Sequence, residues 1–110
     1  MASTSVKPLF LDVVLSTNLI DAWQPINAPG GFEAAIFFMR IVNDTGVPLF
    51  ISFDGVNSHE YIPVGGVFEL PSQANAQPNG REALFAKNTI VYVNGKAGES
   101  GLVSLSGYYV

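Results

Sequence analysis

The fold is decided by three neighbouring stretches of sequence: FEAAIFFMRIV (residues 32–42), NDTG (residues 43–46) and LFISF (residues 49–53). Side chains of a strand alternate between its two faces, and residues 32–42 carry apolar side chains at both parities. This pattern predicts a central strand that is covered on both sides, by the core or by a partner. The NDTG run has the composition of a turn, so we expect the two apolar runs to form a β-hairpin.

The remaining sequence also consists of short apolar runs, which are separated by many of its 11 Gly and 7 Pro residues. Such punctuation is typical of all-β proteins. We expect strands at residues 9–15, 32–42, 49–53, 60–63, 67–70, 89–93 and 102–110, and a strand or one helical turn at 82–86. Irregular connections are expected at residues 21–31 and 71–80. The prediction is an all-β, jelly-roll-like β-sandwich with about seven or eight short antiparallel strands and no substantial helix.

In the longest predicted strand, each face carries a different set of side chains. One face holds Ala35, Phe37, Met39 and Ile41, and the other holds Ala34, Ile36, Phe38, Arg40 and Val42. If the first of these faces belongs to the core, replacing Phe37 with Ala is expected to cost about 3–5 kcal/mol.

The chain length predicts one domain, because 110 residues can bury about two-thirds of their surface in a single core. We expect this domain to span residues 1–110, with residues 1–8 as an N-terminal arm. Only 13% of the residues are charged, whereas globular domains average about 25%. A surface covered by Ser, Asn, Gln and Thr would explain this, but the 13 aromatic residues favour a surface covered by other subunits.

Aromatic side chains on strands and in the first irregular connection are the candidate interface. Interface cores are enriched in aromatic residues and depleted in Lys, Glu and Asp. Aromatic rings could also form a platform on which a sugar stacks, although on strands they more often belong to a core or an interface. The candidate interface residues are Trp23, Phe38, Tyr61, Tyr108 and Tyr109.

Composition excludes several classes of protein. The absence of Cys excludes disulfide scaffolds and thiolate metal sites, and one His cannot form a multi-His site. A net charge of −4 with five dispersed basic residues argues against nucleic acid as a partner. No apolar run approaches the roughly 20 residues of a membrane helix. Asp12 interrupts the apolar run after Lys7, so we expect neither a signal peptide nor export.

The patterns that could indicate chemistry are weak. His59 lies near Ser52, Ser58 and Asp54 in sequence, but the Gly-x-Ser-x-Gly motif of a nucleophile elbow is absent. Gly95 and Lys96 do not complete a phosphate-binding loop. The oxygens of residues 54–60 lack the spacing of a calcium loop and fit an ordinary turn. We therefore expect no enzymatic activity, no cofactor and no metal site.

Two parts of the chain carry a resemblance to a known group of proteins. They are RIVNDTGVPLFISFDG (residues 40–55) with HEYIPVG (59–65), and TIVYVNGKAG (89–98) with SGYY (106–109). Over residues 39–110 the chain resembles small virion structural proteins of tailed bacteriophages. The shared motifs are strand and turn signatures. The resemblance implies a non-enzymatic β-sandwich that assembles on a phage particle.

These observations lead to one main hypothesis and two alternatives. The main hypothesis is a capsid decoration or cement protein, located in the virion after synthesis in the host cytoplasm, with residues 1–8 lying against a neighbour. Its partners would be copies of itself and other virion proteins, such as major capsid, portal, neck or tail proteins. One alternative is a neck or tail ring protein at the head–tail connection. The other is a carbohydrate- or receptor-binding β-sandwich that uses the aromatic residues and the loop at 71–80.

Overall fold

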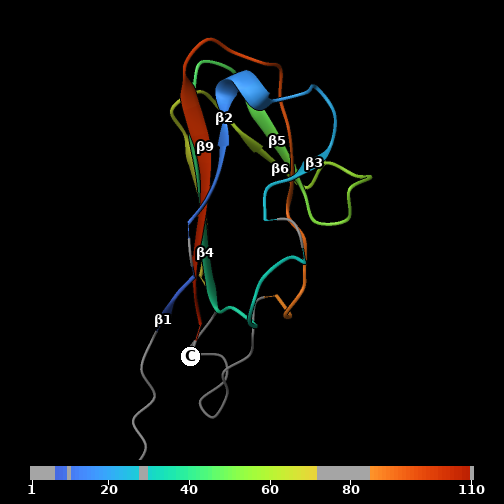
Figure 1. Ribbon diagram of the computed structural model, residues 1–110, viewed down its shortest axis with the longest axis vertical. Helices are drawn as coiled ribbons and strands as arrows, with labels where there is room; N and C mark the ends of the chain where they lie inside the picture. The colour runs from blue at the N-terminus through green and yellow to red at the C-terminus, as the bar shows by residue number, and fades with distance from the viewer. Residues whose placement is uncertain (1–6, 10, 28–29, 72–84, 110) are drawn as a thin grey trace, which may run out of the picture.

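The computed structural model describes residues 7–9, 11–27, 30–71 and 85–109, which form nine strands in two antiparallel sheets. The two sheets form two layers, with β2, β9 and β4 in one layer and β3, β5 and β6 in the other (Figure 1). The only helical element of the described residues is a 3-10 turn, η1 (Ser16–Asn18). Sheet A contains β1 (Lys7–Pro8), β2 (Asp12–Leu15), β4 (Phe38–Thr45), β7 (Val67–Pro71) and β9 (Gly101–Tyr109). Sheet B contains β3 (Gln24–Pro25), β5 (Leu49–Ser52), β6 (Glu60–Ile62) and β8 (Tyr92–Asn94).

The strand pairing follows the order of a jelly roll. β2 pairs with β9, β3 with β8, β4 with β7 and β5 with β6, and every pair is antiparallel. The chain therefore behaves as one long hairpin whose apex is the connection between β5 and β6. From β2 to β5 successive strands alternate between the two sheets, and from β6 to β9 they alternate again. The predicted all-β, jelly-roll-like sandwich is confirmed.

The predicted hairpin between residues 32–42 and 49–53 is wrong. β4 extends through Thr45 and pairs with β7 and β9, whereas β5 pairs with β6 and β8 in the other sheet. The chain crosses between sheets at residues 46–48 and does not turn back on itself. Two of the polar residues that resemble a turn in sequence are buried near the end of β4, since Asn43 is 0% exposed and Thr45 is 5% exposed, while Asp44 between them is exposed on the opposite face.

Asn43 explains how polar residues are accommodated inside the sandwich. Its Nδ2 donates to the carbonyl oxygens of Val47 at 2.9 Å, Ile62 at 3.1 Å and Pro63 at 3.1 Å. Its Oδ1 accepts from the Thr45 N–H at 3.0 Å and from the Thr45 hydroxyl at 2.6 Å. Buried polar groups are tolerated when they are paired in this way. The side chain thus ties the crossing between sheets to the turn that follows β6.

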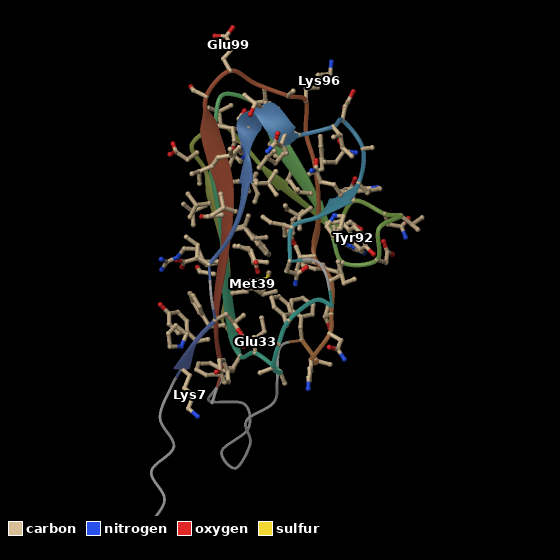
Figure 2. All side chains as sticks on the ribbon, in the orientation of Figure 1. Lys7, Glu33, Met39, Tyr92, Lys96 and Glu99 are labelled. Carbon is tan, nitrogen blue, oxygen red and sulfur yellow. The ribbon has the colours of Figure 1, made fainter. Side chains whose placement is uncertain are left out.

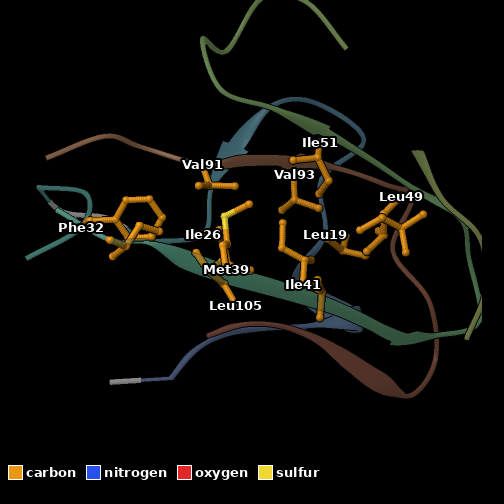
Figure 3. Packing of buried hydrophobic residues seen from close by; sticks show 13 residues of the cluster. Leu19, Ile26, Phe32, Met39, Ile41, Leu49, Ile51, Val91, Val93 and Leu105 are labelled. Carbon is orange, nitrogen blue, oxygen red and sulfur yellow. The ribbon is translucent and has the colours of Figure 1, made fainter. Parts of the chain in front are cut away.

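In the described part of the chain, thirteen buried apolar residues form the core between the sheets. In Figure 3, Ile41 and Leu105 from sheet A face Ile51 and Val93 from sheet B. Among the described residues these are Leu19, Ile26, Phe32, Ile36, Met39, Ile41, Leu49, Ile51, Ile62, Val91, Val93, Val103 and Leu105.

The prediction of one continuous strand over residues 32–42 is wrong. The regular strand begins at Phe38, and Ile36 before it makes only an isolated bridge to Phe85. Ile36 and Met39 are both 0% exposed although they differ in parity, so the alternation is interrupted between them. Phe37 is only partly buried, which places Ile36 rather than Phe37 in the core.

Several other segments also differ from the expectation. The first irregular connection contains the short strand β3, and the buried Asn27 fixes this region to the segment that precedes β8. The Asn27 Nδ2 donates to the Thr89 carbonyl at 3.0 Å, and its Oδ1 accepts from the Val91 N–H at 2.9 Å. In the predicted arm, Lys7 and Pro8 pair with β9, while residues 1–6 lie outside the described residues. The same holds for residues 72–80 of the predicted loop and for 82–84.

Candidate interface

The outer face of sheet A is the surface turned away from the core. Its members alternate with core residues along four strands, and the strand register aligns them in rows. We define this outer face by the following residues: Val13, Leu15, Phe38, Arg40, Val42, Asp44, Val67, Glu69, Leu102, Ser104, Ser106 and Tyr108.

A row of three valines and one serine, called the apolar row below, crosses this outer face. Val13 on β2 pairs with Ser104 on β9, which pairs with Val42 on β4, which pairs with Val67 on β7. Val13 is 41% exposed and Val67 is 55% exposed. Leu15 in the neighbouring row is 50% exposed. Half-exposed aliphatic side chains on the face of a sheet are favourable to cover, because burial of apolar area contributes roughly 25 cal/mol per Å².

Charge on the outer face is confined to three residues. Arg40 and Glu69 are cross-strand neighbours, and the Arg40 Nε donates to the Glu69 Oε2 at 2.8 Å. The guanidinium also lies over the Phe38 ring, with 5.7 Å between its central carbon and the ring centroid. Asp44 follows near the end of β4. The two paired charges cancel, so a partner that covers the face meets little net charge at its centre.

Two of the five predicted interface residues meet on this outer face. Phe38 and Tyr108 are register partners, and their ring centroids are 5.6 Å apart. Tyr108 is 37% exposed and Phe38 is partly buried. Pro8 pairs with Tyr108 on its other side. The aromatic pair thus lies next to the Arg40–Glu69 ion pair, which separates it from the row of valines.

The other three predicted interface residues lie elsewhere. Tyr61 belongs to sheet B, where it pairs with Phe50 at a ring-centroid distance of 5.2 Å. Tyr109 packs against the core, which leaves only part of its ring for an outside contact. Trp23 is partly buried in the connection that leads to β3. The structure therefore divides the predicted set between two sheets, the core and a loop.

A pocket of about 330 Å³ lies beside Phe50. The side chain of Phe50 is 42% exposed and forms part of the lining, and the other contributions come from the end of β8 and from three connections between strands. Sequence reasoning missed this pocket. Side chains alternate along a strand, so a core position for Leu49 and Ile51 already implies that Phe50 points the opposite way. The lining residues are Asp21, Val47, Pro48, Phe50, Asn94, Gly95 and Lys96.

The connection between β5 and β6 is organised around one carboxylate. The Asp54 Oδ1 accepts from the N–H groups of Asn57 at 2.9 Å and Val56 at 2.8 Å, and from the Ser52 hydroxyl at 2.9 Å. The Oδ2 accepts from the Asn57 side chain at 3.0 Å. These hydrogen bonds, those from the backbone first, hold the pKa of Asp54 well below its ordinary value. The carboxylate thus serves as the internal scaffold of the loop.

His59 lies in the same loop but does not form a catalytic relay with its neighbours. In such a relay the imidazole accepts the serine proton at one nitrogen and donates to the acid from the other. Here the His59 Nδ1 accepts from the Phe53 N–H at 3.0 Å, and the Ser52 hydroxyl donates to Asp54. The His59 Nε2 lies 3.9 Å from the Asp54 Oδ2. Both side chains therefore stabilise the turn.

Neither a metal-binding cluster nor a membrane-spanning helix occurs among the described residues. The described residues contain no cluster of three or more His, Asp or Glu side chains that could hold a metal ion. Within the same residues, the single short helical turn lacks the length needed to cross a bilayer. The chain matches no protein-family model, and no curated protein was found that matches it.

Proposed function

We propose that this protein is a non-enzymatic structural subunit of a tailed-phage virion, which docks through the outer face of sheet A. The observation that carries the proposal is the apolar row from Val13 to Val67 on a sheet face with only three charged residues. Double-sheet jelly rolls serve in viral capsids and also in lectins, so the fold is compatible with this role. The low charge of the whole sequence points the same way.

The energetic basis of docking is modest per contact and large per particle. A standard interface buries about 1,600 Å² in total, or about 800 Å² on each partner. The Arg40–Glu69 pair is already satisfied within the face, which lowers the cost of removing water from both charges. Many copies on one particle add avidity, because each subunit can hold several neighbours at once.

Capsid decoration is the role that this arrangement favours. A decoration protein needs one broad face against the shell, and the outer face of sheet A is such a surface. A neck or tail ring is the alternative. Each ring subunit needs two different complementary faces at a fixed rotation, and the exposed Phe50–Tyr61 pair on sheet B would be the second face. The partners are other virion proteins and copies of the chain, and the protein resides in the virion.

The test is co-sedimentation of the purified protein with phage particles that lack it. Val67→Lys places an ammonium at the β7 end of the apolar row, and Val56→Lys makes the same change at a 75% exposed position in the β5–β6 connection. We expect the wild type and Val56→Lys to bind, and Val67→Lys to bind at least about tenfold more weakly, which corresponds to about 1.4 kcal/mol. Equal binding of both variants would overturn the proposal, as would the absence of binding by the wild type.

A further inference from the structure

We infer that the pocket beside Phe50 is a saccharide-binding site, which takes a neutral pyranose ring through its apolar face and its hydroxyl groups. The pocket lies at the loop end of sheet B and shares no lining residue with the outer face of sheet A. Lys96, one of its lining residues, is at the end of the molecule far from Lys7 (Figure 2). The inference goes beyond the docking role and does not depend on it.

The apolar part of the pocket suits the face of a sugar ring. Phe50 offers an aromatic ring that is 42% exposed, and Tyr61 supports it at 5.2 Å between ring centroids. Val47 and Pro48 add aliphatic lining from the crossing between β4 and β5. A volume of about 330 Å³ lies at the lower end of the range for ligand sites, roughly 300–1,000 Å³. This size fits a single ring better than an extended ligand.

The polar part of the pocket contains three kinds of hydrogen-bonding group. The Asp21 carboxylate only accepts, the Lys96 ammonium only donates, and the Asn94 amide does both. Hydroxyl groups donate and accept, so a polyhydroxylated ring can pair with all three. A purely apolar ligand would remove these groups from water without pairing them. One acid and one base give the lining no net charge, which favours a neutral ligand.

The pocket walls are held in place before any ligand arrives. The Asp21 N–H donates to the Gly95 carbonyl at 2.8 Å, which joins the loop before β3 to the loop after β8. The Gln24 side chain accepts from the Ile20 N–H at 3.1 Å and donates to the Asn18 carbonyl at 3.2 Å. Asp21 and Lys96 make no salt bridge within the described part of the chain. Their charged groups therefore remain available, and fixed walls reduce the entropic cost of binding.

Gly95 lets the loop after β8 pack closely on β5 beside the pocket. A Cβ built at this buried position would lie 2.6 Å from the Leu49 Cδ2, so any larger residue would have to displace the core or the loop. Glycine lets the backbone after β8 lie directly on β5. The segment from Asn94 to Lys96, which lines the pocket, thus stays close to β5, the strand that carries Phe50.

The experiment titrates the uniformly ¹⁵N-labelled protein with four methyl α-glycosides, those of glucose, galactose, mannose and N-acetylglucosamine. We expect at least one glycoside to cause saturable amide shifts at residues 21, 47 and 94–96, with a Kd near the millimolar range. Asp21→Asn is the sharpest variant, because Asn also adopts the positive φ of 58° found at Asp21 and the fold is retained. It removes the charged acceptor and should weaken binding at least about tenfold.

Two further variants complete the test. Phe50→Ala should abolish the saturable shifts, and Tyr108→Ala on sheet A should leave them unchanged. The inference is overturned if none of the four glycosides gives saturable shifts up to about 20 mM. It is also overturned if the shifts map outside the pocket, or if Asp21→Asn binds like the wild type. The docking proposal is unaffected by these results, because its disruptive variant, Val67→Lys, lies on sheet A and its readout is particle binding.

Discussion

Replacing Asn43 with Ala should destabilise the protein far more than its polar side chain suggests. Asn43 is 0% exposed and takes part in five side-chain hydrogen bonds. The change leaves the Thr45 N–H without its acceptor and three carbonyl oxygens without this donor. Net hydrogen bonds contribute about 1 kcal/mol each, and a buried group left unpaired costs about 1–3 kcal/mol, so we expect a loss of about 3–5 kcal/mol.

The measurement is urea denaturation of the wild type and of the variants Asn43→Ala, Asn57→Ala and Asn43→Asp. Unfolding is monitored by fluorescence, and the free energy of unfolding is obtained by linear extrapolation. Asn57→Ala is the matched control, since Asn57 is exposed and its side chain makes one hydrogen bond, to Asp54. We expect this control to lose about 1 kcal/mol or less. A loss below about 1 kcal/mol for Asn43→Ala would refute the role assigned to the buried amide.

Asn43→Asp gives a second, independent readout of the same site. The introduced carboxyl would be buried and would face the carbonyl oxygens of Val47, Ile62 and Pro63. Both effects disfavour its charged form, so its pKa in the folded state is raised above the unfolded value. The folded state then binds more protons, and the stability of the variant falls as pH rises. A variant equally stable at pH 4 and pH 7 would contradict this geometry.

Three further predictions concern single side chains. Gly101 has a φ of +95°, and a Cβ there would clash with the Asp44 carbonyl oxygen. Gly101→Ala should therefore clearly lower the urea midpoint of unfolding. An unchanged midpoint would count against the register of β9. The buried Ser16 Oγ has no hydrogen-bond partner in the described residues, so Ser16→Ala should leave the free energy of unfolding unchanged or raise it in the same assay. A loss of stability above about 1 kcal/mol would contradict this and indicate that the hydroxyl makes a hydrogen bond. The lowered pKa of Asp54 means that its contribution is present above the unfolded value of 3.8 and is lost as pH falls through the folded value. The stability difference between wild type and Asp54→Asn, followed by thermal unfolding, should therefore shrink below about pH 4, and a constant difference would contradict the loop geometry.

The sequence was sufficient for the fold class because local patterns determine it. Short apolar runs bounded by Gly and Pro predicted the strands near β5, β6, β7 and β9 within one or two residues. Pairing was less accessible, since it depends on contacts between distant segments. Nothing local distinguishes the polar run at residues 43–46 from a hairpin turn. Its burial depends on carbonyl groups of β6 and the turn after it, which are nearly 20 positions away.

The candidate interface shows the same division between local and distant information. Aromatic composition predicted that Phe38 and Tyr108 are surface residues of interest, and the structure places them in contact. The apolar row through Val13 and Val67 was not predicted, because it joins four strands that are far apart in sequence. The pocket beside Phe50 was missed for a similar reason, since its lining is drawn from residues 21, 47–50 and 94–96.

Footprinting of the protein on phage particles tests the docking face most directly. Hydroxyl radicals oxidise exposed side chains, and mass spectrometry reads the oxidation of each residue in the free and in the particle-bound protein. We predict strong protection of Val67 and Tyr108 on the outer face of sheet A, with Val56, which is 75% exposed, oxidised equally in both states. Unchanged oxidation of Val67 and Tyr108 on the bound protein, or protection of Val56 in their place, would contradict docking through sheet A.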